Sequence, residues 1–465
     1  MIRAALLGAA LITVGAIVTL ATPQSASLAL SLYVGQAIVA AHALPTTLGA
    51  QSFAAAGSRW YAEGWFGAAV TWLVYRFGGY PALVGGNCIL ACLAIALVEM
   101  RCRERRLSDA ATGLVLVAVI VTAAGVLHVG DAMADLPFAA GLLLLMSGFP
   151  DRRSWFVIPL TLLWVNVSPD GLIAPLLVTC VIVGATLRKG AAAAGQKDSL
   201  LFVSAVVAVT LLTPATVNSW LNYGAYLGFD PSINVVSWDP VRVSASAFLA
   251  GLVPLMIFGT WLGLRRGGNA PDVIVALGAI VLALMQGRYL GVAAIAAAPS
   301  LGAALDAVTI ALRTRSAAAP RRTTFVGAAA VIALIAVSAA FVSSARGAQP
   351  FEGGKDPYAA IEKLASDGRA HHLLCTNPSW CNYALLRGAP SLQVFLDGRE
   401  VAYPESVRTD SAKIASGSPL WLHRVKKWNV DTIVASRGTL ASLLALLPQW
   451  RSVPMPGDVV VFERR

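Results

Sequence analysis

The stretch YPALVGGNCILACLAIALVEMRCRERR, residues 80–106, decides the fold class of this chain. Residues 80–99 form an apolar run of the length that an α-helix needs to cross the hydrocarbon core of a bilayer, about 20 residues. Four arginines follow at once: Arg101, Arg103, Arg105 and Arg106. Basic residues gather at the cytoplasmic ends of membrane spans. The stretch therefore predicts a membrane span that ends at the cytoplasmic face.

The composition shows that this pattern extends over most of the chain. Of the 465 residues, 57% are apolar and only 13% are charged, whereas soluble proteins average about 25% charged residues. Mean hydropathy is +0.70. Apolar runs recur as far as about residue 345, so the first of them is not the signal peptide of a secreted domain. These values exclude an ordinary soluble enzyme and a disordered chain, and they indicate an α-helical polytopic membrane protein.

We predict about 11 transmembrane helices in residues 1–345. They are 4–22, 80–99, 108–127, 134–149, 154–167, 170–187, 199–215, 246–264, 272–287, 289–306 and 324–345.

The positive charges agree with this assignment. The net charge is +11, and residues 1–345 hold 20 basic and 13 acidic residues, or +7 of it. With Arg3 inside, alternation of the spans puts all the remaining basic clusters inside as well. They are 101–106, 151–153, 188–197, 265–266 and 313–322. The positive-inside rule expects this pattern, whereas a nucleic-acid-binding protein collects its basic residues on one surface. We therefore expect no nucleic-acid partner, a cytoplasmic N-terminus and an external C-terminus.

Residues 23–79 form a long external loop in this topology. Two of its segments, 28–44 and 60–77, are apolar, and the second is rich in Trp and Tyr. Such residues prefer the membrane interface, so we expect two helices that lie along it. A later external loop, 216–245, also carries aromatic and acidic residues.

Residues 346–465 differ from the rest of the chain. Strands predicted at 372–375, 393–395, 432–435 and 459–462 alternate with helices, which favours a small extracytoplasmic α/β domain. Cys375 and Cys381 lie in this region. They form a disulfide if the domain is outside the cytoplasm, or they remain two buried free thiols. No zinc-type spacing of Cys and His occurs, so we predict no metal ligands here.

The hairpin between the third and fourth spans holds His128, Asp131 and Asp135. The two aspartates are four residues apart and share a face if the segment is helical. Paired carboxylates beside a membrane cavity suit a general base or a divalent cation. The alternative is that a short loop between spans simply needs polar residues.

Asp170 and Arg288 are the other ionisable groups at predicted span mouths. Such groups are costly there and suggest function. Asp170 follows a Ser-Pro pair and is either a helix-capping residue or a substrate contact. Arg288 interrupts a long apolar run. Its planar fork of donors suits a lipid phosphate, and an ion pair with an external aspartate is the competing interpretation.

A series of short motifs spans nearly the whole chain. In order, it comprises His42-Ala-Leu-Pro45, Ser52-Phe53, Trp60-Tyr-Ala-Glu63-Gly-Trp65, Tyr75-Arg-Phe-Gly-Gly79, Leu163-Trp-Val-Asn166, Trp238-Asp-Pro240, Arg288-Tyr289, Val394-Phe-Leu-Asp397-Gly-Arg399 and Tyr403. Together with the long first external loop and the external tail, this order resembles GT-C-type membrane glycosyltransferases, in particular a bacterial and archaeal branch. The tail segment Trp380-Cys-Asn382-Tyr383 is also loosely similar to the Trp-Trp-Asp-Tyr-Gly region of oligosaccharyltransferase catalytic subunits.

The resemblance implies an inverting transfer of a sugar from a polyprenyl-phosphate donor on the external side. Relatives carry an acidic base early in the first external loop, but this chain has Ser25, Ser27 and Ser31 there. A serine hydroxyl cannot accept a proton at neutral pH as a carboxylate does. Asn382 likewise stands where the oligosaccharyltransferase motif has Asp. Glu63 is the acid that remains in the loop.

We therefore predict a glycosyltransferase of the bacterial inner membrane that serves envelope or exopolysaccharide glycosylation. Its predicted base is Asp131, Glu63 or Asp135. The predicted substrate-binding residues are Arg288 for the lipid phosphate, together with His128, Asp170, Trp65 and Trp238. The predicted partners are the polyprenyl-phosphate sugar and a glycan or lipid acceptor, with no certain cofactor. We expect the Asp397-Gly-Arg399 turn to be structural, with Arg399 pairing with neighbours of Asp397 and fixing the tail against the membrane domain.

Two other interpretations of the chain stay open. A catalytically silent GT-C-like protein that binds a lipid-linked glycan, or helps to assemble one, fits the three serines. A transporter fits less well, because transporters often show paired halves and broken helices in matching positions, and neither symmetry is evident.

Overall fold

The computed structural model describes most of the chain. The described residues are 2–20, 25–124, 127, 129, 133–189, 196–229, 257, 259, 261, 265, 269–313, 351, 357–388, 391–454 and 459–465. The predicted span 324–345 and most of the predicted span 246–264 lie outside them.

The chain divides into two compact units. The first comprises Met1–Ala21, Leu83–Ser219 and Val236–Gly347, and the second comprises Thr22–Ala82, Trp220–Val235 and Ala348–Arg465. The second unit thus combines the residues predicted as the first external loop with those predicted as the external tail.

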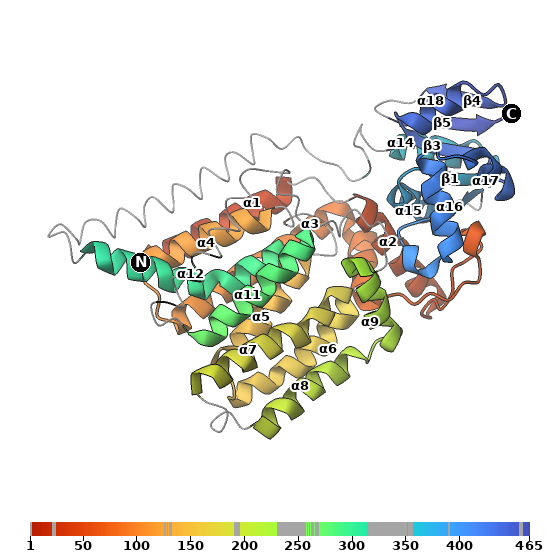
Figure 1. Cartoon of the computed structure of the whole chain (residues 1–465). Coiled ribbons are helices and arrows are strands. Elements are labelled where there is room, and N and C mark those ends of the chain that lie inside the picture. Colours follow the sequence, from red (N-terminus) through yellow and green to blue (C-terminus); the bar gives the residue numbers. More distant parts are fainter. Residues whose placement is uncertain are drawn as a thin grey trace. The chain divides into compact units, whose positions relative to one another are not determined.

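The first unit is helical throughout its described residues. Its elements are α1 (Ile2–Leu20), the later part of α3 (Trp65–Glu104), α4 (Asp109–Ala123), α5 (Asp135–Leu145), η4 (Met146–Gly148), η5 (Arg152–Phe156), α6 (Val157–Val167), η6 (Pro169–Ile173), α7 (Ala174–Lys189), α8 (Gln196–Thr210), α11 (Ala270–Met285), η10 (Gly287–Tyr289) and α12 (Leu290–Arg313). α11 packs against α7 and α12, and α12 packs against α4 (Figure 1).

Each predicted span within the described residues contains a helix. Three helical segments are long and apolar enough to cross a membrane: Trp65–Glu104, Pro169–Arg188 and Gly287–Thr309. Five shorter apolar helices accompany them: Arg3–Thr19, Ser27–Ala41, Asp109–Ala123, Asp135–Gly148 and Ala270–Met285. The prediction of a mostly helical protein with a C-terminal α/β region is confirmed, whereas the total of 11 spans stays a prediction.

α3 passes from one unit into the other through a break. Gly79 has φ 62° and ψ −162° inside the helix, a left-handed φ that glycine adopts without steric cost. Pro81 follows and lacks the N–H that would continue the helical ladder. The segment predicted to lie at the interface and the segment predicted to span are therefore joined by one bent helix.

The second unit contains a five-stranded sheet. Its strands are β1 (His371–Cys375), β2 (Leu392–Val394), β3 (Thr432–Ser436), β4 (Trp450–Pro454) and β5 (Val459–Arg464). The order is β2-β1-β3-β5-β4, in which β2, β1 and β3 are parallel and β5 is antiparallel to both of its neighbours. The four predicted strands are confirmed. β4 was not predicted.

Helices accompany this sheet (Figure 1). In the tail they are α14 (Tyr358–Ser366), α15 (Pro378–Arg387), η11 (Glu400–Ala402), α16 (Glu405–Ala415), α17 (Trp421–Lys427) and α18 (Thr439–Ala445), and the same unit holds α2 (Ser25–Ala41), η1 (Phe53–Ala55), most of α9 (Val217–Gly224) and the π-helix Ala225–Phe229.

Residues of the first loop complete the core of the tail. Leu48 and Ala55 belong to the same buried cluster as Phe395 of the tail, and the ring of Phe53 stacks on that of His372 with centroids 4.4 Å apart. α2 packs along α15. The sheet and the loop therefore share one hydrophobic core.

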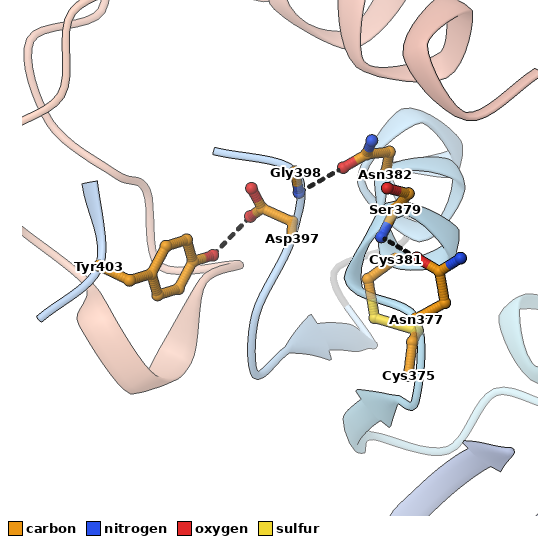
Figure 2. Close-up of a disulfide and its surroundings, with 8 residues drawn as sticks. All are labelled: Cys375, Asn377, Ser379, Cys381, Asn382, Asp397, Gly398 and Tyr403. Atoms are coloured by element: carbon orange, nitrogen blue, oxygen red, sulfur yellow. Dashed lines mark hydrogen bonds between the residues drawn. A yellow bond between two sulfur atoms is a disulfide. The ribbon is translucent and has the colours of Figure 1, made fainter. Parts of the chain in front are cut away.

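A disulfide joins Cys375, the last residue of β1, to Cys381 in α15. Their Cα atoms are 5.9 Å apart, and Figure 2 shows the bond beside the first turn of the helix. Asn377 caps this helix by accepting a hydrogen bond from the backbone N–H of Ser379 at 3.0 Å. Of the two alternatives for this cysteine pair, the structure has the disulfide.

Candidate functional site

Glu63 lies in the loop that leads into α3. Its carboxylate accepts a hydrogen bond from the side-chain amide of Asn222 in α9, at 2.7 Å. The side chain is partly buried, and the preceding residue, Ala62, belongs to an apolar cluster with Val34, Ile38 and Ala68. Burial raises the pKa of Glu63 to about 7, and the hydrogen bond from Asn222 opposes this rise. Glu63 is therefore a carboxyl group that exchanges its proton near neutral pH.

α2 and α3 approach each other closely at a point five residues after Glu63 in the chain. A Cβ atom added at Gly35 of α2 would lie 2.1 Å from the backbone oxygen of Ala68 in α3. Only glycine allows the two backbones to meet at this distance. Trp65, a predicted substrate contact, packs against the same apolar cluster as Ala62.

Asp135 and Asp170 meet in the first unit. Asp135 begins α5, and its carboxylate accepts a hydrogen bond from the indole N–H of Trp164 at 2.7 Å. The carboxyl groups of Asp135 and Asp170 also interact with each other. Both residues are buried, with exposed fractions of 3% and 1%.

Asp170 is bound by Arg288 and Tyr289 of η10, the two residues that precede α12. One of its carboxylate oxygens accepts a hydrogen bond from the guanidinium of Arg288, and the other accepts one from the hydroxyl of Tyr289 at 2.6 Å. The helix cap is Ser168, whose hydroxyl accepts from the backbone N–H of Asp170 at 3.2 Å. The capping interpretation of Asp170 is therefore wrong, because its carboxylate is directed to Arg288 and Tyr289.

The Arg288 side chain is 9% exposed in this ion pair. Of its two predicted roles, the structure contains the ion pair with an aspartate. The pair is buried, so the loss of one partner would leave a charge without compensation in an apolar region.

The predicted site residues divide between the two units. Asp135, Asp170 and Arg288 lie together in the first unit, and Glu63 and Trp65 lie in the second. Three others lie outside the described residues: His128, Asp131 and Trp238.

No group of three or more His, Cys, Asp or Glu side chains within the described ranges could hold a metal ion. Asp131 is outside those ranges, so the divalent-cation alternative at the Asp131–Asp135 hairpin stays a prediction.

The Asp397-Gly-Arg399 turn has a buried polar network that the sequence did not reveal. The guanidinium of Arg399 donates to both carboxylate oxygens of Asp397, at 2.9 and 2.7 Å. It also donates to the hydroxyl of Ser52 in the first loop, at 2.8 Å. The Tyr403 hydroxyl donates to Asp397 as well (Figure 2). All four side chains are 3% exposed or less.

The same turn is held from α15. The side chain of Asn382 accepts a hydrogen bond from the backbone N–H of Gly398 at 2.8 Å (Figure 2). Asn382 stands at the position of the motif aspartate in oligosaccharyltransferases. In this chain it supports the turn.

The charges in this network compensate one another. Burial by itself raises the pKa of Asp397, but the charge and hydrogen bonds of Arg399 outweigh burial and hold that pKa below its ordinary value. Burial and the neighbouring Asp397 carboxylate raise the pKa of Tyr403. The network therefore holds one carboxylate and one guanidinium at neutral pH. Asp397, Arg399 and Tyr403 are close together in the sequence, which predicted a structural turn, whereas Ser52 lies 345 residues before Asp397 and no local pattern links it to the turn.

No protein-family model and no curated protein sequence matches the chain. Solved structures do match it. One is the archaeal oligosaccharyltransferase AglB from Archaeoglobus fulgidus, in complex with an inhibitory peptide and a dolichol-phosphate, with a TM-score of 0.64 and 11% identity over 93% of this chain and 69% of that one. Another is ArnT from Cupriavidus metallidurans bound to undecaprenyl phosphate, with a TM-score of 0.58 and 15% identity over 99% of this chain and 97% of that one.

ArnT in the apo state matches similarly, with a TM-score of 0.57 and 15% identity over 98% of this chain and 96% of that one. At these identities the likeness concerns the fold. The fold and the apolar helices together make this a membrane protein. Nearly the whole chain is therefore similar in fold to the GT-C-type membrane glycosyltransferase superfamily, which the order of its motifs also indicates.

Proposed function

We propose that this protein is a membrane glycosyltransferase. It would transfer a sugar from a polyprenyl-phosphate-linked donor to an envelope or exopolysaccharide acceptor on the external face of the membrane. The observation that carries the proposal is the match over 93% or more of the chain to an oligosaccharyltransferase in complex with a dolichol-phosphate and to ArnT bound to undecaprenyl phosphate.

Glu63 is the general base in this proposal. Its carboxylate takes the proton of an acceptor hydroxyl while the hydroxyl oxygen forms a bond to the anomeric carbon of the sugar. The bond from that carbon to the phosphate oxygen breaks, and its electron pair leaves with the polyprenyl phosphate. A pKa of about 7 suits this task, because a base works best when its pKa lies near the working pH.

Glu63 is a better candidate than Asp135. Asp135 is 3% exposed and its carboxylate accepts from the indole of Trp164, whereas Glu63 is partly exposed and accepts a hydrogen bond from Asn222. Asp131 remains in the proposal as an alternative base, with His128 to orient the acceptor.

Arg288 binds the lipid phosphate in this proposal. Its guanidinium already holds one anionic group, the carboxylate of Asp170, and its fork geometry suits a phosphate equally well. Trp65 and Trp238 contribute aromatic surface for the sugar.

The proposed location is the bacterial inner membrane, with the second unit outside the cytoplasm. The basic clusters support a cytoplasmic N-terminus, and the Cys375–Cys381 disulfide supports an oxidising compartment for the tail.

The test combines a transfer assay with a binding assay. In cells that depend on the gene for a glycan product, Glu63→Gln should reduce that product by about 100-fold or more. The purified variant should still bind undecaprenyl phosphate, as measured by native mass spectrometry. Arg288→Gln should weaken that binding by about tenfold or more, because it removes a charged donor.

The catalytically silent alternative predicts a different result. A binding or assembly protein would retain undecaprenyl phosphate affinity and would show an unchanged glycan product in Glu63→Gln. The serines at positions 25, 27 and 31 of the first loop are the observation that favours it. A Glu63→Gln protein with full glycan output would therefore exclude Glu63 as the base.

A further inference from the structure

Arg399 has more contacts than the neutralisation of Asp397 requires. Its guanidinium binds both oxygens of Asp397 and, through the same Nη2 atom, the hydroxyl of Ser52. The side chain is 3% exposed. A single charge beside Asp397 would satisfy that carboxylate, so the contacts to the first loop call for a separate explanation.

The faces of the guanidinium contact two aromatic rings of the first loop. Its central carbon lies 4.8 Å from the ring centroid of Trp60 and 5.3 Å from that of Tyr33 in α2. Cations over aromatic faces are attracted to them, by about 2 kcal/mol when water is excluded. Arg399 therefore ties a loop segment and a helix to the same buried turn.

Trp60 and Tyr33 are the side chains that join the tail core to the surroundings of Glu63. Trp60 packs both against the cluster that contains Phe395 and against the cluster that contains Ala62. Tyr33 packs both against the tail cluster around α15 and against the Ala62 cluster. Ala62 directly precedes Glu63 in the chain.

The backbone between these points has little freedom. Trp60 donates a backbone hydrogen bond to the carbonyl of Thr46 at 2.9 Å, and Thr47 pairs with Arg59 in an antiparallel bridge. The backbone is therefore held at Trp60, three residues before Glu63.

We propose that Arg399 is a positioning residue that holds Trp60 and Tyr33 in place and thereby keeps Glu63 partly buried and hydrogen-bonded to Asn222. The inference rests on the proposed function only for the role of Glu63 as the base. The placement of Glu63 itself can be measured without any transfer reaction.

Arg399→Lys separates this role from the support of the tail. A lysine keeps a positive charge for Asp397, but it lacks the planar guanidinium that lies over Trp60 and whose Nη2 atom also reaches Ser52. Arg424→Lys is the matched control. Arg424 forms a comparable ion pair in the tail, with Asp410 at 2.9 Å, and its guanidinium also donates to the backbone carbonyl of Pro419.

The measurement is the reaction of Glu63 with a hydrophobic carbodiimide, which attacks protonated carboxyl groups. The full-length protein in detergent is treated across a pH series, and the Glu63 peptide is quantified by mass spectrometry. Burial and the Asn222 amide are the two influences on the pKa of Glu63 within the described residues. A change in burial therefore shifts the pH at which labelling is half-complete, which we call the labelling midpoint. In the wild type, labelling should fall as the pH rises through about 7.

Arg399→Lys should shift this midpoint by one pH unit or more toward the ordinary value for glutamate, because a loosened loop admits water to Glu63. Trp60→Leu removes the ring that Arg399 contacts in the first loop and should shift the labelling midpoint in the same direction. This second variant replaces Arg399→Lys if that protein fails to fold. Arg424→Lys should keep the wild-type midpoint. A wild-type midpoint in either Arg399→Lys or Trp60→Leu, or an equal shift in Arg424→Lys, overturns the proposal.

The two proposals fail in different experiments. Full glycan output from Glu63→Gln removes Glu63 as the base but leaves the labelling midpoints unaffected. Unshifted midpoints refute the positioning role of Arg399 and leave the base assignment to the transfer assay.

Discussion

At the scale of single residues, the state of Glu63 depends on a balance between burial and one hydrogen bond. Burial in the apolar cluster disfavours the charged carboxylate, and the amide of Asn222 favours it. Because a base must be deprotonated to work, the rate of the proposed sugar transfer should rise as the pH increases through about 7.

Asn222→Leu should move this rise to higher pH. The change removes the donor that stabilises the carboxylate, so the pKa of Glu63 rises further above its ordinary value. A hydrogen bond worth about 1 kcal/mol corresponds to a shift of somewhat less than one pH unit. The measurement is the pH profile of glycan transfer. Asn218→Leu, at an exposed position of the same helix, is the control, and a midpoint at or below the wild-type value in Asn222→Leu would contradict the assignment.

At the scale of elements, α2 and the start of α3 meet close to Glu63 in the chain, at Gly35 and Ala68. The break at Gly79 separates an early segment in the second unit from a long apolar segment in the first. The early segment crosses α2 so closely at Gly35 that a methyl group would overlap the Ala68 carbonyl.

Gly35→Ala should therefore destabilise the protein and reduce activity. The added Cβ would lie 2.1 Å from a backbone oxygen, which cannot turn aside as a flexible side chain does, and overpacking of this kind costs about 1–3 kcal/mol. Gly8→Ala is the matched helical control, because nothing lies within 4 Å of the added Cβ there. Thermal unfolding in detergent measures both variants, and equal melting temperatures would show that α2 and α3 have room to separate.

At the scale of the whole molecule, the second unit brings together residues more than 300 positions apart in the chain. Ser52 donates to Asp397 at 3.2 Å across a sequence separation of 345 residues, and Leu48 shares a core with Phe395. The first loop and the tail therefore lie on the same side of the membrane, and in our proposal that side is external.

Labelling of introduced cysteines tests this topology. Leu446→Cys, at a position that is 80% exposed in the tail, should react with a membrane-impermeant maleimide on intact cells. Arg152→Cys, at an exposed position in a predicted cytoplasmic loop, should react only after permeabilisation. The reverse pattern would refute the proposed orientation. The parent chain, whose four free cysteines are buried or half-buried, measures the background.

The sequence by itself determined the features that depend on local chemistry. Apolar runs closed by arginines, such as residues 80–106, predict spans because each residue contributes to membrane transfer independently of its distant neighbours. The alternating strands and helices of the tail follow from local periodicity. β4, at residues 450–454, was not predicted, because its hairpin with β5 supplies the pairing.

The tertiary structure alone decided which polar groups meet. Nothing local shows that Asp170 binds Arg288, 118 residues away, while Ser168 caps the helix. Nor does the Asp397-Gly-Arg399 turn reveal Ser52 or Trp60 as partners. Such contacts form because burial forces each charged or polar group to find a partner, and the choice of partner depends on how distant helices and strands pack. The predicted membrane enzyme thus rests on composition and motif order, whereas the positions of its acids are a property of the folded chain.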